Sequence, residues 1–168
     1  MALSMSQASI SIFTQQLTTL SGLIDKAAEH CKAKGVDPSN MIGARLAPDM
    51  FPFSRQVQLA TDHAKGATAR LSGRENPKFE DTESTFEELK ARIAKTLAFV
   101  KSVPASEIDG SEEKDVSITV GGQPRTLKGQ RYFLQNALPN FFFHVTTAYD
   151  ILRNQGVAIG KRDYMGTY

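Results

Sequence analysis

The 168-residue chain has little of several residue types, and each shortage excludes a class of protein. It contains one cysteine, Cys31, so no disulfide can form within it. Its 20 basic and 18 acidic residues leave a formal charge of +2 without a basic stretch, which argues against nucleic-acid binding. No run approaches the roughly 20 apolar residues of a membrane span, and residues 1–13 lack the pattern of a secretory leader. We expect a cytoplasmic protein that binds neither nucleic acid nor membrane.

The length and composition are those of one globular domain, which we expect to span residues 1–168. At this size, folding buries roughly 70% of the unfolded surface, so the core needs no disulfide or structural metal. Cys31 falls on an apolar helix stripe. We interpret it as a small core residue rather than a nucleophile, because free cysteine is among the most buried residue types.

The first half of the chain predicts two long helices, from apolar or small residues spaced by three and four. The first runs from about Ser6 to Lys34 and ends at Gly35. The second spans about Phe53 to Ser72, between Pro52 and Gly73, and its stripe is largely alanine. Small residues allow helices to approach closely or leave room for a ligand between them. The segment between the two helices is expected to be irregular, with a helical turn at residues 40–46.

The third predicted helix has a clear start and a clear end. Ser84 and Glu87 have the spacing of a capping box, in which the two residues satisfy each other's free backbone N–H groups. Pro104 ends the helix. Glu88 and Arg92 lie four residues apart, so we expect them to pair on its outer face.

The remaining chain predicts a β-hairpin and a fourth helix. Residues 116–120 alternate with period two, and Gly121-Gly122 separates them from a second β-prone run at 123–127. The helix follows in two pieces, 130–138 and 140–155, divided by Pro139, and residues 157–168 look extended. Four long amphipathic helices favour an all-α, antiparallel four-helix bundle with a small hairpin between helices three and four.

Two of the three histidines are candidates for a site. His30 lies near a helix end, where an imidazole interacts favourably with the helix dipole. His63 lies beside the alanine stripe, and His144 lies in an otherwise apolar row of the last helix. Because a buried imidazole needs a hydrogen-bond partner, each could be a satisfied core residue, or the two could face one another across a pocket. The candidate partners and pocket residues are Asp49, Asp62, Tyr149 and Asp150.

Several segments resemble a bacterial and fungal family known as a domain of unknown function, within the DinB/YfiT-like superfamily of four-helix bundles. They extend over essentially the whole chain: RLAPDMFPF at 45–53, TFEEL at 85–89, PNFFFH at 139–144, LR at 152–153 and the glycine-flanked residues 156–161. The resemblance implies the bundle fold. It also implies a homodimer, since some members dimerise, and an activity such as thiol-dependent transfer or isomerisation.

The resemblance further implies three metal-binding histidines, one on the second helix and two spaced by four on the fourth. His63 corresponds approximately to the first and His144 to the second, but Ala148 occupies the third position and cannot bind metal. A zinc site needs at least three protein ligands, and the chain has no His-x-x-x-His or Cys-x-x-Cys spacing. The sequence therefore predicts a degenerate metal site.

Three hypotheses follow for the function. In the first, the bundle binds a small ligand or a partner protein at the degenerate site. In the second, it is a divalent-metal-dependent enzyme of the thiol-transferase type, in which His63 and His144 bind zinc or nickel. In the third, it is a structural module that closes a homodimer. A pocket beside the two histidines would separate the first two hypotheses from the third, and we favour the first.

Overall fold

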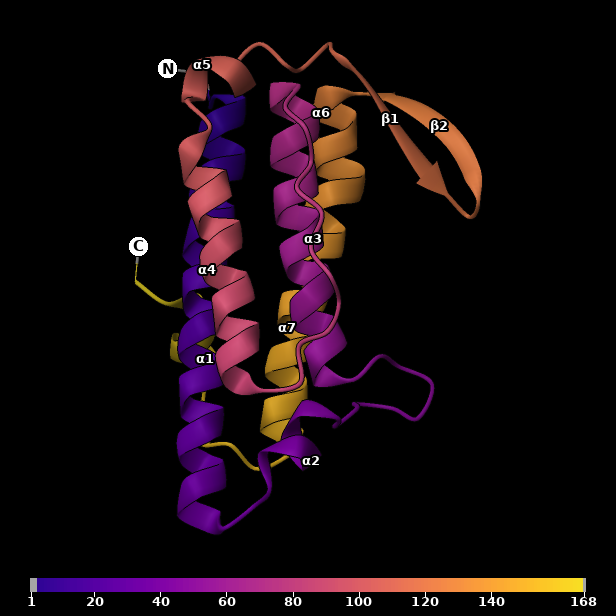
Figure 1. The fold of residues 1–168 in the computed structure, drawn as a ribbon. Coiled ribbons are helices and arrows are strands. Elements are labelled where there is room, and N and C mark those ends of the chain that lie inside the picture. Colours follow the sequence, from indigo (N-terminus) through magenta and orange to yellow (C-terminus); the bar gives the residue numbers. More distant parts are fainter. Residues whose placement is uncertain (1–2, 168) are drawn as a thin grey trace.

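Four long helices run side by side in the computed structural model, which describes residues 3–167 (Figure 1). They are α1 (Ile12–Lys34), α3 (Phe53–Ser72), α4 (Phe86–Ser102) and α7 (Leu138–Asn154). Helix α1 packs chiefly on α4, and α3 packs on both α7 and α4. The predicted four-helix bundle is therefore confirmed. None of the helices in residues 3–167 is long and apolar enough to cross a membrane.

Helix α1 runs antiparallel to α4, and α3 runs antiparallel to α7, but α3 and α4 run parallel to each other. Lys90, near the start of α4, pairs with Asp25 in the second half of α1. By contrast Arg74, just after α3, donates to the carbonyl of Ser102, the last residue of α4. Helices α3 and α4 thus run in the same direction, because residues 73–85 return along the length of the bundle (Figure 1). We call residues 73–85 the crossover segment.

Helices α1 and α3 begin and end close to their predicted bounds. A π-helical segment, η1 (Gln7–Ser11), leads directly into α1, and Gly35 ends α1 with a φ of 64°. The short α2 (Pro38–Ile42) begins earlier than the predicted turn, because the Asp37 side chain caps it by accepting from the N–H of Ser39. Cys31 is buried, as predicted.

The start of α4 corrects two sequence-based predictions. Thr85, not Ser84, is the N-cap, and its capping-box partner is Glu88 rather than Glu87. The predicted pair of Glu88 and Arg92 on the outer face is also wrong. Glu88 is engaged by the backbone at Ser84 and Thr85, and the Arg92 side chain is only 1% exposed because it points toward α3.

The predicted hairpin is confirmed. After the short α5 (Ala105–Ile108), strands β1 (Asp115–Val120) and β2 (Gln123–Lys128) pair antiparallel, with Val116 opposite Leu127. Gly121 and Gly122 have φ values of 58° and 76°, the left-handed conformation that a two-residue turn of this type requires. Val116 belongs to the buried core, so the hairpin is anchored to the bundle at its base.

The last long helix is continuous through Pro139. It comprises α6 (Gly129–Tyr132), the π-helical segment η2 (Phe133–Ala137) and α7. The wider turn of η2 directly precedes Pro139, where the proline ring and its missing N–H would disturb a regular α-helical turn. The prediction of an extended tail is wrong at α8 (Lys161–Met165), since Asp163 caps this helix at the N–H of Gly160 and pairs with Lys26. Residues 1, 2 and 168 of the predicted domain lie outside the described residues.

Candidate functional site

His63 and His144 face each other across the contact of α3 and α7. Their ring centroids are 5.4 Å apart and the ring planes differ by 13°. The predicted approach of the two side chains is therefore confirmed, while their function stays a prediction. The two rings meet because α3 and α7 pack antiparallel and each histidine lies on the inward side of its helix.

A glutamine fixes the orientation of His144. The Nδ1 atom of His144 lies 2.7 Å from Oε1 of Gln56, on α3. The Nε2 group of Gln56 donates to the carbonyl oxygen of Phe51, so Oε1 is the end of the amide that can only accept. His144 therefore carries its proton on Nδ1, and its Nε2 keeps a free lone pair.

Both imidazoles are neutral at pH 7. Burial, together with the nearby His63 and Arg55, lowers the pKa of His144 from 6.5 to about 4. Burial also lowers the pKa of His63; Asp62 opposes this effect, and Arg70 adds to it. The pair thus offers uncharged hydrogen-bonding groups rather than a positive charge.

A cleft of about 790 Å³ opens beside His63. One wall is the side of α3 that carries Asp62, His63 and Arg70, and the others are the crossover segment, the tip of the hairpin and the helix that contains Tyr132 and Asn140. His144 lies behind His63 and does not line the cleft. The cleft therefore presents His63 to a ligand, with His144 as its support.

The other predicted site residues are placed differently. Asp62 lines the cleft, but its carboxylate holds Arg92 at 2.8 Å and Lys65 at 3.1 Å, and it forms no hydrogen bond to either imidazole. Asp49 is exposed in the irregular segment before α3, and neither it nor Asp150 lines the cleft. The Tyr149 ring packs against Tyr164 of α8, with centroids 5.6 Å apart. The position of Tyr149 follows from helix geometry, since it lies five residues after His144 and its side chain therefore points about 140° away from the face of α7 that carries His144.

The side chains present do not complete a metal centre. Within residues 3–167, no three His, Cys, Asp or Glu side chains are grouped so that they could hold an ion. Ala148, one turn after His144, is fully buried and contributes only a methyl group. Two histidines fall short of the three protein ligands that zinc sites require. The site as built does not fit a resident divalent metal.

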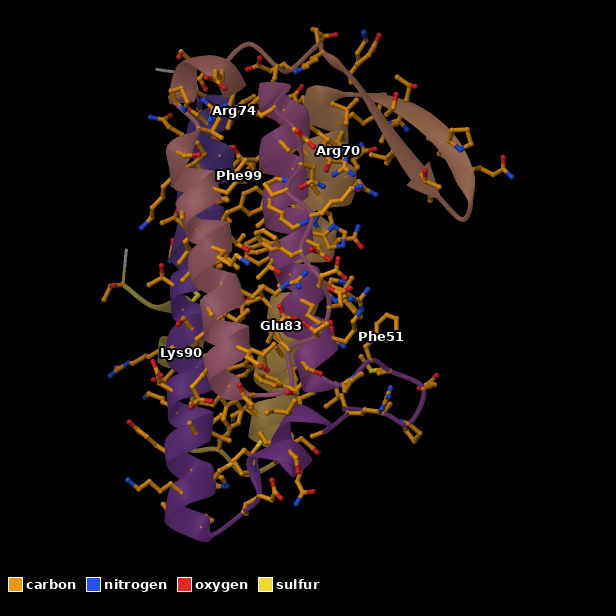
Figure 2. The ribbon with its side chains drawn as sticks, viewed as in Figure 1. Phe51, Arg70, Arg74, Glu83, Lys90 and Phe99 are labelled. Atoms are coloured by element: carbon orange, nitrogen blue, oxygen red, sulfur yellow. The ribbon has the colours of Figure 1, made fainter. Side chains whose placement is uncertain are left out.

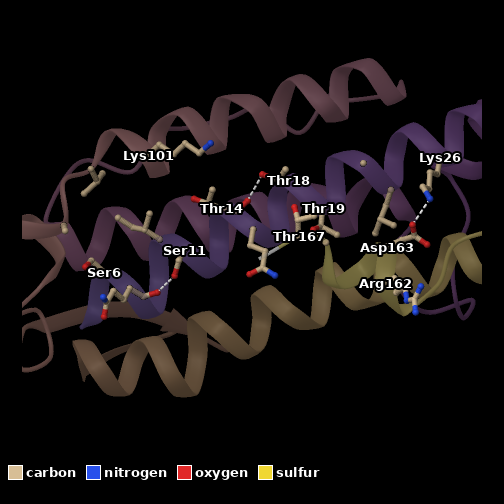
Figure 3. A pocket seen from close by; sticks show the side chains of 18 residues that line it. Ser6, Ser11, Thr14, Thr18, Thr19, Lys26, Lys101, Arg162, Asp163 and Thr167 are labelled. Carbon is tan, nitrogen blue, oxygen red and sulfur yellow. Dashed lines mark hydrogen bonds and ion pairs between the residues drawn. The ribbon is translucent and has the colours of Figure 1, made fainter. Parts of the chain in front are cut away.

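A second groove lies on the other side of the bundle, over α1, and has a volume of about 1170 Å³ (Figure 3). Threonine side chains of α1 line it with Ser6 and Ser11, which lie before and in η1, together with Lys101 of α4 and the ion pair of Lys26 with Asp163. None of the three histidines lines this groove. We therefore place the candidate site in the cleft beside His63.

Two residues of the site were missed by sequence reasoning, Gln56 and Arg70. They are seven residues before and seven residues after His63 on α3. Because seven residues make about two helical turns, the three side chains share one face of the helix. This spacing is the signal that could have found them.

The family described as a domain of unknown function (DUF1993) matches residues 5–165. The chain belongs to this family. It is similar to a solved structure, the crystal structure of a DinB family member protein from Shewanella denitrificans, with 36% sequence identity and a TM-score of 0.89. The match covers 97% of this chain and 92% of that one, and it confirms the resemblance to the DinB-like superfamily. Among curated proteins, none matches this DUF1993 chain.

Proposed function

We propose that this protein binds a small organic ligand in the cleft beside His63. The observation that carries the proposal is the neutral imidazole of His63 at a cleft wall, backed by the neutral imidazole of His144, without a third metal-binding side chain grouped with them within residues 3–167. A cleft lined by a few convergent polar groups and by groups of shifted pKa is the usual form of a small-molecule site. His144, whose orientation is fixed by Gln56, stacks against His63 on the side away from the cleft.

The neutral pair favours a ligand that donates a hydrogen bond. A neutral imidazole has one nitrogen that accepts, and here the low pKa values keep that nitrogen unprotonated at pH 7. His63 would make the direct contact, because it lines the cleft while His144 does not. The hydrogen bond from His144 to Gln56 keeps the second ring from rotating away.

A fragment screen monitored by NMR tests the proposal. Fragments that bind should shift the Hε1 signal of His63, and His63→Ala should weaken their binding by about tenfold, since loss of one buried polar contact costs about 1–3 kcal/mol. His30→Ala is the matched control, because this histidine lies on α1 outside the cleft. Fragments that bind only in the groove of Figure 3, with no effect of His63→Ala, would contradict the proposal.

A second candidate function is divalent-metal-dependent chemistry of the thiol-transferase type, with zinc or nickel. One observation favours it: His144 donates from Nδ1 and leaves Nε2 free, which is how metal-binding histidines are oriented by their neighbours. The untagged protein should be assayed for metal by mass spectrometry, before and after soaking with zinc and nickel. Stoichiometric metal that is lost in His63→Ala and His144→Ala would replace the first proposal with this one.

The homodimer also remains a proposal. Phe143, on α7, is 56% exposed, and Leu134, in η2 of the same long helix, is 51% exposed. Large apolar side chains exposed on one helix are a feature of protein interfaces. Sedimentation velocity at micromolar concentration should show a dimer that Phe143→Ser weakens, and a monomer at every concentration would refute it.

A further inference from the structure

Arg70 is a cation at the cleft wall without an acidic partner. It lies on α3 about two turns after His63, and Figure 2 shows it on the side of the bundle that carries the hairpin. Its Nη1 donates to the Tyr132 hydroxyl at 3.3 Å, and its guanidinium carbon lies 5.8 Å from the Tyr132 ring centroid. Within residues 3–167, none of the ion pairs includes Arg70.

Gly66 leaves the space that the Arg70 guanidinium occupies. A Cβ atom on Gly66 would lie 2.6 Å from Nη1 of Arg70 and 3.7 Å from Nδ2 of Asn76. The guanidinium therefore rests on the bare backbone of α3, one turn before its own Cα, with an amide group beside it. This fold of the side chain turns the charge toward His63, whose pKa it lowers.

The charges that line the cleft leave Arg70 uncompensated. Three cations line it, Lys65, Arg70 and Lys78, against two carboxylates, Asp62 and Glu80. Lys65 is paired with Asp62, and that carboxylate also holds the buried Arg92. The cleft thus has an excess of one positive charge, which a monoanionic ligand would balance.

The groups around Arg70 are suited to a carboxylate. A guanidinium presents parallel N–H groups in a planar fork that matches the two carboxylate oxygens. Burial raises the pKa of Tyr132, so its phenol keeps its proton and can donate it to an anion while it accepts from Arg70. Asn76 adds a neutral N–H donor on the same side.

We propose that the cleft takes a small organic carboxylate, anchored by Arg70 and Tyr132, with the rest of the molecule extending over Gly66 toward His63. This ligand class rests on the ligand-binding function proposed above. Arg70 supplies charge and direction, and His63 accepts a hydrogen bond from a hydroxyl, amide or thiol group elsewhere on the ligand.

The test compares carboxylates with neutral molecules of the same shape. Benzoate and butanoate are titrated against ¹⁵N-labelled protein, with benzamide and butanamide as matched probes and inorganic phosphate as a competing anion. The carboxylates should shift the backbone amide of Gly66 and the side-chain amide of Asn76, and the two neutral amides should not. Arg70→Gln should weaken carboxylate binding by about tenfold or more. Arg131→Gln makes the same charge change on α6, outside the cleft, and should leave binding unchanged.

A second variant tests the anchor without removing its charge. Gly66→Ala places a methyl group 2.6 Å from Nη1 of Arg70, which is too close for a real contact, so the guanidinium must move away from Gly66. The fold should hold, because the atom in the way is the end of a flexible side chain and alanine favours helix more than glycine does. Carboxylate binding should fall several-fold while the melting temperature holds or rises.

The outcomes separate this inference from the function on which it rests. Amides that bind as well as carboxylates, and shift the His63 signal, would overturn the carboxylate but leave ligand binding at the cleft intact. Phosphate that binds more tightly than both carboxylates, binding unaffected by Arg70→Gln, or no shift at Gly66 with either carboxylate would also overturn it. In the last case the His63→Ala fragment screen still decides the broader proposal.

Discussion

Arg70 belongs to α3 and Arg92, from α4, packs against α3, and the two arginines differ in how their charges are satisfied. The Arg92 side chain is 1% exposed, and every guanidinium nitrogen has a partner: Nε donates to Thr61 at 2.7 Å, Nη1 to the Glu80 carbonyl at 2.9 Å and Nη2 to Asp62 at 2.8 Å. Asp81 and Glu83 complete what we call the Arg92 cluster. Arg70 is exposed and has one neutral partner, Tyr132.

The difference indicates that the Arg92 cluster stabilises the fold, whereas Arg70 is free to bind a ligand. The carboxylates of Asp81 and Glu83 belong to the crossover segment, so the Arg92 cluster ties that segment to α3 and α4. Figure 2 shows Glu83 beside these helices, away from the hairpin. A cation that is saturated by its own chain has no capacity left for a ligand, whereas Arg70 and His63 retain theirs.

The largest effect is expected from removing the buried arginine. Arg92→Met keeps much of the side-chain volume but removes the cation that Asp62, Asp81 and Glu83 share, and it leaves the largely buried Glu83 without an ion-pair partner, which should cost about 3 kcal/mol of unfolding free energy. Arg74→Met is the control, because its ion pair with Glu107 is exposed to solvent and contributes little to stability. Urea unfolding measures both. Equal losses for the two variants would show that the Arg92 cluster does not hold the crossover segment.

The histidine pair should make the protein less stable in mild acid. The pKa of His144 is about 4 in the folded protein and 6.5 ordinarily, so between these values the unfolded chain binds more protons. Its contribution is fully present above pH 6.5, is lost as the pH falls, and levels off near pH 4. The loss should reach about 3 kcal/mol, since each pKa unit corresponds to about 1.4 kcal/mol. Unfolding curves across this window should flatten in His144→Gln, and a wild-type curve that is already flat would refute the buried neutral pair.

Two buried glutamines of α3 allow a matched comparison, because Gln56 belongs to the histidine pair and Gln58 to the Arg92 cluster. Gln56→Leu leaves the buried Nδ1–H of His144 without an acceptor and should cost about 1–3 kcal/mol. Gln58→Leu removes a hydrogen bond to Glu83, which still has Arg92, and should cost less than about 1 kcal/mol. Thermal unfolding of the two variants shows which loses more stability. A larger loss for Gln58→Leu than for Gln56→Leu would contradict the expectation that the Gln56–His144 hydrogen bond is the more important one.

The smallest effect on stability is expected at the proposed anchor. Arg70→Gln should change the unfolding free energy by less than about 0.5 kcal/mol, because an exposed cation without an acidic partner contributes little. Measured beside Arg92→Met, this variant tests the comparison directly. A loss above about 2 kcal/mol would make Arg70 a structural residue and remove the contrast.

Local patterns in the sequence predicted the elements, and contacts between distant segments explain what they missed. Pro52 and Gly73 delimit α3 from within its own sequence, and the Gly-Gly pair specifies the hairpin in the same way. The burial of Arg92 depends on carboxylates of the crossover segment, which has no periodicity to read. The observed N-cap of α4, Thr85, lies one residue after the predicted one, Ser84, because both side chains are able to cap a helix.

The site residues divide in the same way: local patterns predict some of them, and contacts between distant segments determine the others. His63 and His144 could be predicted to meet because each lies in an inward row of its helix. Gln56 could not be predicted as the partner of His144, since that requires knowing which turn of α3 lies opposite α7. Asp49 was misassigned because it lies in a segment without a regular period, and Asp62 because its strongest partners are on α4 and one turn along α3.

The π-helical turn η2 sets the rotational phase between the two halves of the last helix. Tyr132, Asn136 and Asn140 all line the cleft at intervals of four residues, which would drift by about 40° per step in an α-helix. The wider turn of η2, with its i→i+5 bonds, removes most of that drift and aligns the three side chains. If residues 133–137 were wound as an α-helix with no residue removed, Tyr132 would lie about 80° away from the face that carries Asn140, because eight α-helical residues overshoot two turns by that angle. A relative with one residue fewer in this segment and no π-helical turn would keep the polar row on the cleft side, because seven α-helical residues also return to the same face.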